Sequence, residues 1–239
     1  MYRLAIVGDV HGDVHALSDA LAQAAALTCD QVVCAGDLVD YGFFPEETLQ
    51  LLRERRIPTV RGNHDRWAVG LGTADDPNGE GDGTYDATGF DLSAGSLRFL
   101  VELPVSWRME HLGVRVAMFH ASPKGDTVGI YPLMTTKDEV RAALEQADAD
   151  VLIVGHTHGA CALTTKKGGL IVNPGALLRH QGDSSQLSEA VARTSAASGV
   201  PASAIQGGTF GILELPSTRF TLHRASDGGA LELLRCEAE

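Results

Sequence analysis

Side chains that can bind metal recur behind short apolar runs of this sequence. Asp9 and His11 follow one such run, and His156 and His158 follow another. Because positions two apart in an extended backbone point to the same side, each pair can hold one ion. A single Asp-x-His or His-x-His pair often arises by chance, so the recurrence, and not either pair alone, indicates a metal site.

Three further residues extend this pattern. Asp37 stands alone after VVCAG, and one carboxylate can give an oxygen to each of two ions within about 4 Å, so Asp37 is the predicted bridging ligand. Asn63 offers a carbonyl oxygen after TVRG, and His120 offers an imidazole after VRVAMF. A mixed nitrogen and oxygen shell favours Mn, Fe, Zn, Co or Ni over Mg or Ca. We therefore expect two divalent transition-metal ions, with Mn as the first choice.

His64 directly follows Asn63. If Asn63 binds metal, the next side chain points away from the ion and toward the substrate, which suits a general acid. Asp65 is predicted to hold the His64 imidazole in one tautomer and to favour its protonated form. His64 and Asp65 are therefore the predicted catalytic residues, whereas Asp13 and Asp40 are expected to form loops or to support the ligands.

The apolar runs that carry these residues alternate with amphipathic helical stretches. In the first part of the chain the predicted order is strand, helix, strand, helix, strand, at Arg3–Val7, Val14–Leu27, Gln31–Ala35, Pro45–Arg55 and Pro58–Arg61. This repeated β-α-β pattern predicts a layered α/β fold with crossover connections. Ligands of such folds bind at the carboxyl edge of the strands, where the metal-competent residues stand.

The second half of the sequence is richer in strands. Strands are predicted at Val105–Met109, Val114–Phe119, Val151–Val154, Ala160–Thr164, Gly169–Val172, Phe210–Leu215 and Phe220–Arg224, and helices near Tyr85–Val101 and Lys137–Ala147. A second sheet packed on the first accounts for this distribution. The chain is expected to form a single domain over residues 1–239, with a surface loop at residues 70–83 and a cap or insertion at residues 183–199.

Composition and charge exclude several classes of function. The chain has 239 residues, and 31 acidic against 19 basic side chains give a formal net charge of −12. General nucleic-acid binding needs clustered Lys and Arg, so it is not expected. The four cysteines form no CxxC pair, which argues against a zinc-thiolate site and a disulfide framework. No run is apolar enough for a signal peptide or a membrane span, so we expect a cytoplasmic location and no membrane partner.

At these residues the sequence resembles the calcineurin-like metallophosphoesterase superfamily, and within it the small bacterial phosphodiesterase-like branch. The resemblance is carried by GDVHG at Gly8–Gly12, GDLVDYG at Gly36–Gly42, GNHD at Gly62–Asp65, FHASP at Phe119–Pro123 and GHTH at Gly155–His158. It implies a four-layer αββα sandwich of two packed mixed β-sheets flanked by helices. It also implies one metal on Asp9, His11, Asp37 and His158, and a second on Asp37, Asn63, His120 and His156.

The resemblance further implies that His64 protonates the leaving group while a hydroxide that bridges the metals attacks phosphorus. The expected substrate is a phosphodiester or a small phosphorylated metabolite, and the oligomeric state is left open. Dinucleoside polyphosphate hydrolysis and protein phosphatase activity are alternatives, but Tyr41 stands where the protein-phosphatase branch has a phosphate-gripping Arg. Phe119 also departs from the usual Gly before the late histidine.

An alternative of another class is a non-catalytic scaffold, since the superfamily includes a retromer subunit. A scaffold would be expected to lack ligands or the acid. The full set of predicted ligands and His64 are present here, which favours an enzyme.

Overall fold

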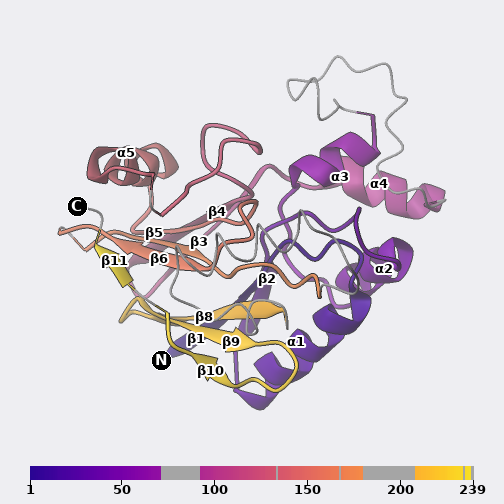
Figure 1. The fold of residues 1–239 in the computed structure, drawn as a ribbon, viewed down its shortest axis with the longest axis horizontal. Coiled ribbons are helices and arrows are strands. Elements are labelled where there is room, and N and C mark those ends of the chain that lie inside the picture. The colour runs from indigo at the N-terminus through magenta and orange to yellow at the C-terminus, as the bar shows by residue number, and fades with distance from the viewer. Residues whose placement is uncertain (71–91, 133, 167, 180–207, 234, 238–239) are drawn as a thin grey trace.

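Two mixed β-sheets packed face to face form the middle of the molecule (Figure 1). The computed structural model describes residues 1–70, 92–132, 134–166, 168–179, 208–233 and 235–237. The first sheet has the order β10-β9-β8-β1-β2, with bounds Ala230–Leu231, Arg219–Arg224, Thr209–Leu215, Tyr2–Val7 and Gln31–Cys34. The second has the order β11-β6-β7-β5-β4-β3, with bounds Arg235–Glu237, Cys161–Thr164, Leu170–Asn173, Val151–Ile153, Val114–Phe119 and Ser106–His111.

The alternation of side chains along β1 explains how the layers meet. Leu4 and Ile6 belong to a buried cluster with residues of the second sheet such as Met118 and Ile153. Ala5 and Val7 point to the opposite face and join a cluster with helix α1. Because neighbouring strand residues face opposite sides, β1 supplies both the contact between the sheets and the contact with the helices.

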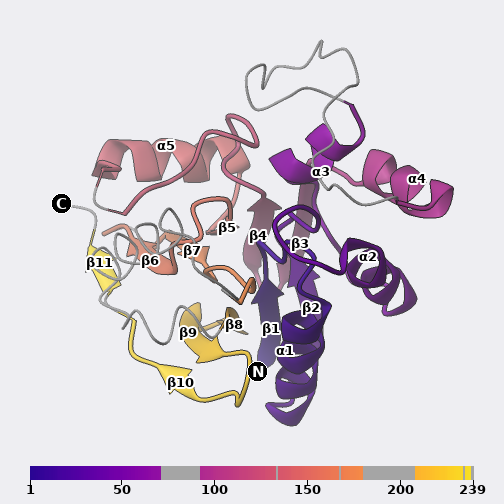
Figure 2. The same ribbon diagram turned by 45° about the vertical axis from the view of Figure 1, so that its right-hand side comes forward.

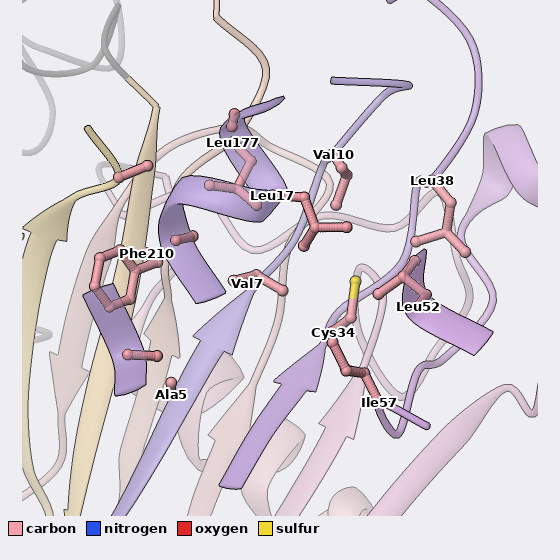
Figure 3. Packing of buried hydrophobic residues seen from close by; sticks show 14 of the residues in the cluster. Ala5, Val7, Val10, Leu17, Cys34, Leu38, Leu52, Ile57, Leu177 and Phe210 are labelled. Atoms are coloured by element: carbon pink, nitrogen blue, oxygen red, sulfur yellow. The ribbon is translucent and has the colours of Figure 1, made fainter. Parts of the chain in front are cut away.

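Helices α1 (Val14–Ala26) and α2 (Pro45–Glu54) cover the outer face of the first sheet. Leu17 of α1 and Leu52 of α2 are fully buried there, and Figure 3 shows Leu52 beside Cys34 of β2. Each fully buried Leu contributes about 1.5–3 kcal/mol through the hydrophobic effect. Helix α1 begins where the Asp13 carboxylate accepts a hydrogen bond from the Ala16 amide, a standard N-cap.

Helix α5 (Lys137–Ala147) covers the outer face of the second sheet. Its Val140 and Leu144 pack on Leu152 and Ile171 of β5 and β7. Figure 2 shows α5 on one side of the strands and α1 and α2 on the other. The order of layers is therefore helix, sheet, sheet, helix, which confirms the predicted four-layer αββα sandwich.

Several predicted elements differ in the structure. The predicted strand at Pro58–Arg61 is wrong: only Thr59 forms a bridge, with Cys34, because Pro58 has no N–H to extend a ladder and Arg61 donates its amide to Pro104 instead. The sequence did not predict the short strands β10 and β11 or the six-residue helix α3 (Asn63–Ala68).

The helix predicted at Tyr85–Val101 is described only from its later part. There α4 spans Ala94–Glu102 and starts at the Ser93 cap, whose hydroxyl accepts from the Ser96 amide. The loop predicted at 70–83, apart from Gly70, and the insertion predicted at 183–199 lie outside the described residues. No helix in the described parts of the chain is long and apolar enough to cross a membrane.

Candidate metal centre

Both sheets contribute side chains to one site at the carboxyl ends of their strands. From the first sheet, Asp9 and His11 follow β1 and Asp37 follows β2. From the second sheet, His120 follows β4, whereas the histidines of the GHTH block follow β5. The parallel pairs β1–β2 and β4–β5 place these strand ends at the same edge, and the face-to-face packing of the sheets brings the two edges together.

The side chains form two groups that share the Asp37 carboxylate. The ligand atoms within each group all lie within 4.8 Å of one another, and the groups consist of Asp9, His11, Asp37 and His158, and of Asp37, His120 and His156. The amide oxygen of Asn63 adjoins the second group, 3.0 Å from His120 Nε2 and 2.9 Å from His156 Nδ1. The structure thus brings together every ligand that the sequence predicted, in the two sets that the resemblance implied.

Backbone carbonyls fix the direction in which two imidazoles face. His11 Nδ1 donates to the Val39 carbonyl at 3.0 Å, and His120 Nδ1 donates to the Ala35 carbonyl at 2.7 Å. The Nε2 atom of each ring therefore faces into the site. A hydrogen bond on the far nitrogen is the usual way in which proteins orient a metal-binding histidine.

The close contacts between acceptor atoms inside the site are better explained by bound cations than by hydrogen bonds alone. His11 Nε2 lies 3.1 Å from His158 Nε2, and the Oδ2 atom of the fully buried Asp9 has no hydrogen-bond partner among the described residues. Acceptors that face one another in a buried site repel unless a cation or a proton lies between them. The donor set of imidazole, carboxylate and amide oxygen suits a divalent transition metal.

Burial and neighbouring charges shift the pKa values of the residues in the site. Burial raises the pKa of Asp9 to about 7, and burial lowers the pKa values of His156 and His158 to about 4. Burial also opposes protonation of His120, yet the Asp37 carboxylate 3.2 Å away raises its pKa to about 10. The protein thus holds neutral imidazoles beside carboxylates that need a positive charge, and a bound cation would compete with the proton on His120.

The backbone around the ligands is strained and cross-braced. Asp9, His11, Asp37, His156 and His158 all have positive φ, between 48° and 66°. Such a conformation costs about 1–3 kcal/mol for a residue other than Gly and persists only where its surroundings enforce it. Part of that enforcement comes from Asp9 itself, whose Oδ1 accepts the His156 amide at 3.0 Å across the two sheets.

Asn173, at the end of β7, holds the GHTH loop in place. Its side-chain amide donates to the Gly155 carbonyl at 2.9 Å and to the Thr157 hydroxyl at 3.1 Å, and its Oδ1 accepts the Gly175 amide at 2.9 Å. This side chain is fully buried. Its signal in the sequence is the NPG block, which directly follows the strand.

His64 lies beside the metal-competent groups without belonging to either. Its Nδ1 donates to Asp40 Oδ2 at 2.7 Å, and its ring meets the His11 ring edge-on at a centroid distance of 5.0 Å. Burial of His64 opposes protonation, but the hydrogen bond with Asp40 and the charges of Asp37, Asp40 and Asp65 together raise the pKa of the imidazole above its ordinary value. The hydrogen bond thus fixes the orientation of the His64 ring, with Nε2 on the side opposite Asp40.

The predicted role of Asp65 is wrong. Its carboxylate accepts the backbone amides of Asp37, Leu38 and Gly62 at 2.7–3.0 Å, so it shapes the start of α3 and the Asp37 loop. Because of the direction of α3, the Asp65 side chain points toward these backbone amides, whereas the His64 imidazole faces Asp40. Sequence reasoning therefore assigned the orienting carboxylate to the adjacent residue and missed Asp40.

Comparisons with known proteins agree with this geometry. Residues 2–197 match the calcineurin-like phosphoesterase superfamily domain. The protein MJ0912 of Methanocaldococcus jannaschii is 28% identical over 172 residues, which cover 72% of this chain and 68% of the relative. A metallophosphoesterase from Sphaerobacter thermophilus superposes with a TM-score of 0.62 at 25% identity, over 93% of this chain and 87% of that one.

The phosphoesterase Yfce from E. coli shares the fold, with a TM-score of 0.52 at 16% identity, over 97% of this chain and 98% of that one. With the family match over most of the sequence, the two residue groups that share one carboxylate and the αββα layers, the chain belongs to the calcineurin-like phosphoesterase superfamily.

Proposed function

We propose that this protein is a dinuclear metal-dependent phosphoesterase that hydrolyses phosphodiesters or small phosphorylated metabolites, with Mn²⁺ as the preferred metal. The observation that carries the proposal is the sharing of Asp37 by two groups of buried ligands, with a separate, oriented imidazole beside them. Asp9, His11, Asp37 and His158 would hold one cation, and Asp37, Asn63, His120 and His156 the other. When bound, two such cations supply Lewis acidity that stabilises charge on the phosphate ester and lowers the pKa of water.

The protein's own part in the reaction falls to His64 and Asp40. His64 donates a proton from Nε2 to the oxygen of the leaving group, so that an alcohol departs instead of an alkoxide. Asp40 holds the opposite nitrogen at 2.7 Å, keeps the ring in one orientation and favours its protonated form. Proton transfer by a positioned side chain contributes about 10²- to 10⁴-fold to the rate.

Charge around the site supports a substrate of low negative charge. Arg66, on α3, is 8% exposed and its guanidinium pairs with the Asp126 carboxylate at 2.7 Å. Tyr41 places a phenol ring, not a guanidinium, beside His64. A phosphodiester carries one negative charge where a monoester carries up to two, so it depends less on protein cations for binding. This observation favours the phosphodiester within the proposed class.

A substrate panel with metal analysis tests the proposal. Purified protein is loaded with Mn²⁺, its metal content is measured, and rates are compared for bis-p-nitrophenyl phosphate, p-nitrophenyl phosphate, a dinucleoside tetraphosphate and a phosphopeptide. We expect about two ions per chain and the highest kcat/KM on the diester. Fast cleavage of the tetraphosphate or the phosphopeptide would instead favour the polyphosphate hydrolase or the protein phosphatase. Bound metal without hydrolysis of any ester would refute the proposal and favour a scaffold.

A further inference from the structure

Tyr41 lies beside both the first ligand group and His64. Its ring centroid is 4.7 Å from that of His11 and 5.0 Å from that of His64. His11 belongs to the first ligand group, and His64 is the acid of the proposed reaction. A substrate whose phosphorus sits at the ligands and whose leaving oxygen meets His64 therefore extends its leaving group past Tyr41.

The protein holds Tyr41 in this place although the backbone is strained. Asp40 and Tyr41 both have positive φ, 74° and 60°, two consecutive left-handed residues other than Gly. Each costs about 1–3 kcal/mol, and strain of this kind concentrates at functional sites. One of the two conformations presents Asp40 to His64, and the next directs Tyr41 to the same imidazole.

Close packing against the preceding loop fixes this turn. A Cβ on Gly42 would overlap the carbonyl oxygen of His11, so only glycine allows the two loops to approach so closely. The Phe44 amide also donates to the Gly12 carbonyl at 3.0 Å, and the Gly12 amide donates to Leu38 at 2.8 Å. The backbone that carries Tyr41 is thus fixed by the packing of the two loops, while 57% of the residue is exposed to solvent.

The exposure of the Tyr41 ring suggests that it contacts a ligand. An aromatic ring that only filled space between His11 and His64 would be expected to be buried, as their neighbour Trp67 is at 8% exposure. A solvent-exposed aromatic ring on a fixed backbone can stack on a second planar ring, and stacking of this kind accepts any base or aryl group because each has a π-face.

We propose that Tyr41 determines specificity by stacking on a planar ring of the leaving group, so that the preferred substrates are nucleoside or aryl phosphate esters. This inference rests on the proposed phosphoesterase function for the position of the leaving group. It assigns Tyr41 a contact with substrate and no part in proton transfer.

Binding of paired phosphonates tests this proposal independently of turnover. Phosphonates resist hydrolysis, so calorimetry on the Mn²⁺-loaded protein can compare one that carries adenosine with one that carries only ribose. A second pair, phenylphosphonate and methylphosphonate, separates an aryl group from a nucleobase. In the unmodified protein we expect the ring-bearing member of at least one pair to bind more tightly, and the pair that shows this identifies the source of the ring.

Substitutions then locate the effect. Tyr41→Ala and Tyr41→Leu should reduce the preference for the ring about 5- to 100-fold, the range expected for loss of one stacking contact, whereas Tyr41→Phe should retain it. Phe43→Ala is the matched control: Phe43 is 65% exposed in the same loop and, among the described residues, makes no ring contact with an imidazole of the site. Metal content is measured for each variant.

Several outcomes overturn the proposal. Equal binding of the two members of both pairs by the unmodified protein would do so, as would absence of binding by all four phosphonates. An equal loss for both members in Tyr41→Ala would show that Tyr41 only supports the imidazoles. Failure of the phosphoesterase function itself is read separately, from the absence of bis-p-nitrophenyl phosphate hydrolysis by the unmodified protein.

Discussion

Replacement of Asp40 by Asn tests whether the Asp40 carboxylate raises the pKa of His64, the proposed general acid. The Asp40 carboxylate accepts from His64 Nδ1 at 2.7 Å, and the two side chains are only 16% and 11% exposed. Asn keeps the size and one acceptor oxygen but removes the negative charge. The exchange should therefore lower the pKa of His64 with little change in the position of the ring.

The size of the effect follows from the distance and the burial. Two unit charges about 4 Å apart attract by about 1 kcal/mol in water and about 4 kcal/mol near a protein surface. The net contribution is smaller than the Coulomb energy because both groups lose hydration, and a hydrogen bond to a charged group is worth about 1.5–3 kcal/mol. With both side chains mostly covered, removal of the Asp40 charge should cost the protonated form of His64 about 2 kcal/mol. Because His64 acts in its protonated form, the alkaline limb of the pH–rate profile should move to lower pH.

Steady-state kcat across pH provides the assay, with bis-p-nitrophenyl phosphate as substrate. On the acid side, where His64 is protonated in both proteins, Asp40→Asn should turn over at nearly the rate of the unmodified protein. Beyond the alkaline limb it should be about 30-fold slower. Asp126→Asn is the control, because Asp126 also carries a charge near the site but pairs with Arg66 and not with His64.

A double variant shows whether Asp40 acts through His64. In a His64→Ala background, Asp40→Asn should change kcat little, because residues that act as a unit are not additive. Two results would refute the reasoning: an unshifted alkaline limb in Asp40→Asn at full metal content, or an undiminished effect of Asp40→Asn when His64 is already absent.

Three further predictions concern the metal centre. Asp37→Ala should lose bound metal, measured by elemental analysis, because both groups share this carboxylate. His64→Ala should keep its metal and lose about 10²- to 10⁴-fold in kcat. Retention of both ions by Asp37→Ala would contradict the bridging role of Asp37. A chelator should lower the thermal midpoint of the unmodified protein, since metal at a hundred times its Kd adds about 2.7 kcal/mol of stability, and should leave that of Asp37→Ala unchanged. Asn173→Ala should weaken metal binding about 10- to 100-fold, measured by titration, because Gly155 and Thr157 lose their hydrogen-bond donor. Asn173→Asp also lacks that donor and should not restore the affinity. Full metal affinity in either variant would show that Asn173 does not hold the GHTH loop in place.

Long amphipathic elements were predictable because periodicity and capping act together in the sequence. Helix α5 was predicted with its bounds. Thr136 and Glu139 form a reciprocal cap, in which the side chain of each accepts a hydrogen bond from the backbone amide of the other. Helix α3 was missed because six residues show no period. Its stability comes from the Asp65 carboxylate on surrounding amides, a tertiary contact that a sequence does not display.

The ligands were predictable for a different reason. Each ligand except Asn63, which begins α3, follows a strand. The shared edge of parallel strands brings such positions together in any α/β fold. The partner of His64 was not predictable in the same way, because Asp65 is adjacent to it in sequence, Asp40 is 24 residues away, and the two carboxylates are equally suited by chemistry. The choice depends on a left-handed turn at Asp40 and on the direction of α3, which only the folded chain determines.

The origin of the ligands from both sheets also bears on how the protein is made. Asp9 belongs to the beginning of the chain, whereas His158 becomes available only after most of it has been synthesised. Neither ion site has its full complement until the second sheet has docked on the first. Uptake of metal therefore reports the completion of folding, and a ribosome-bound fragment that ends before β5 should remain unable to retain ions.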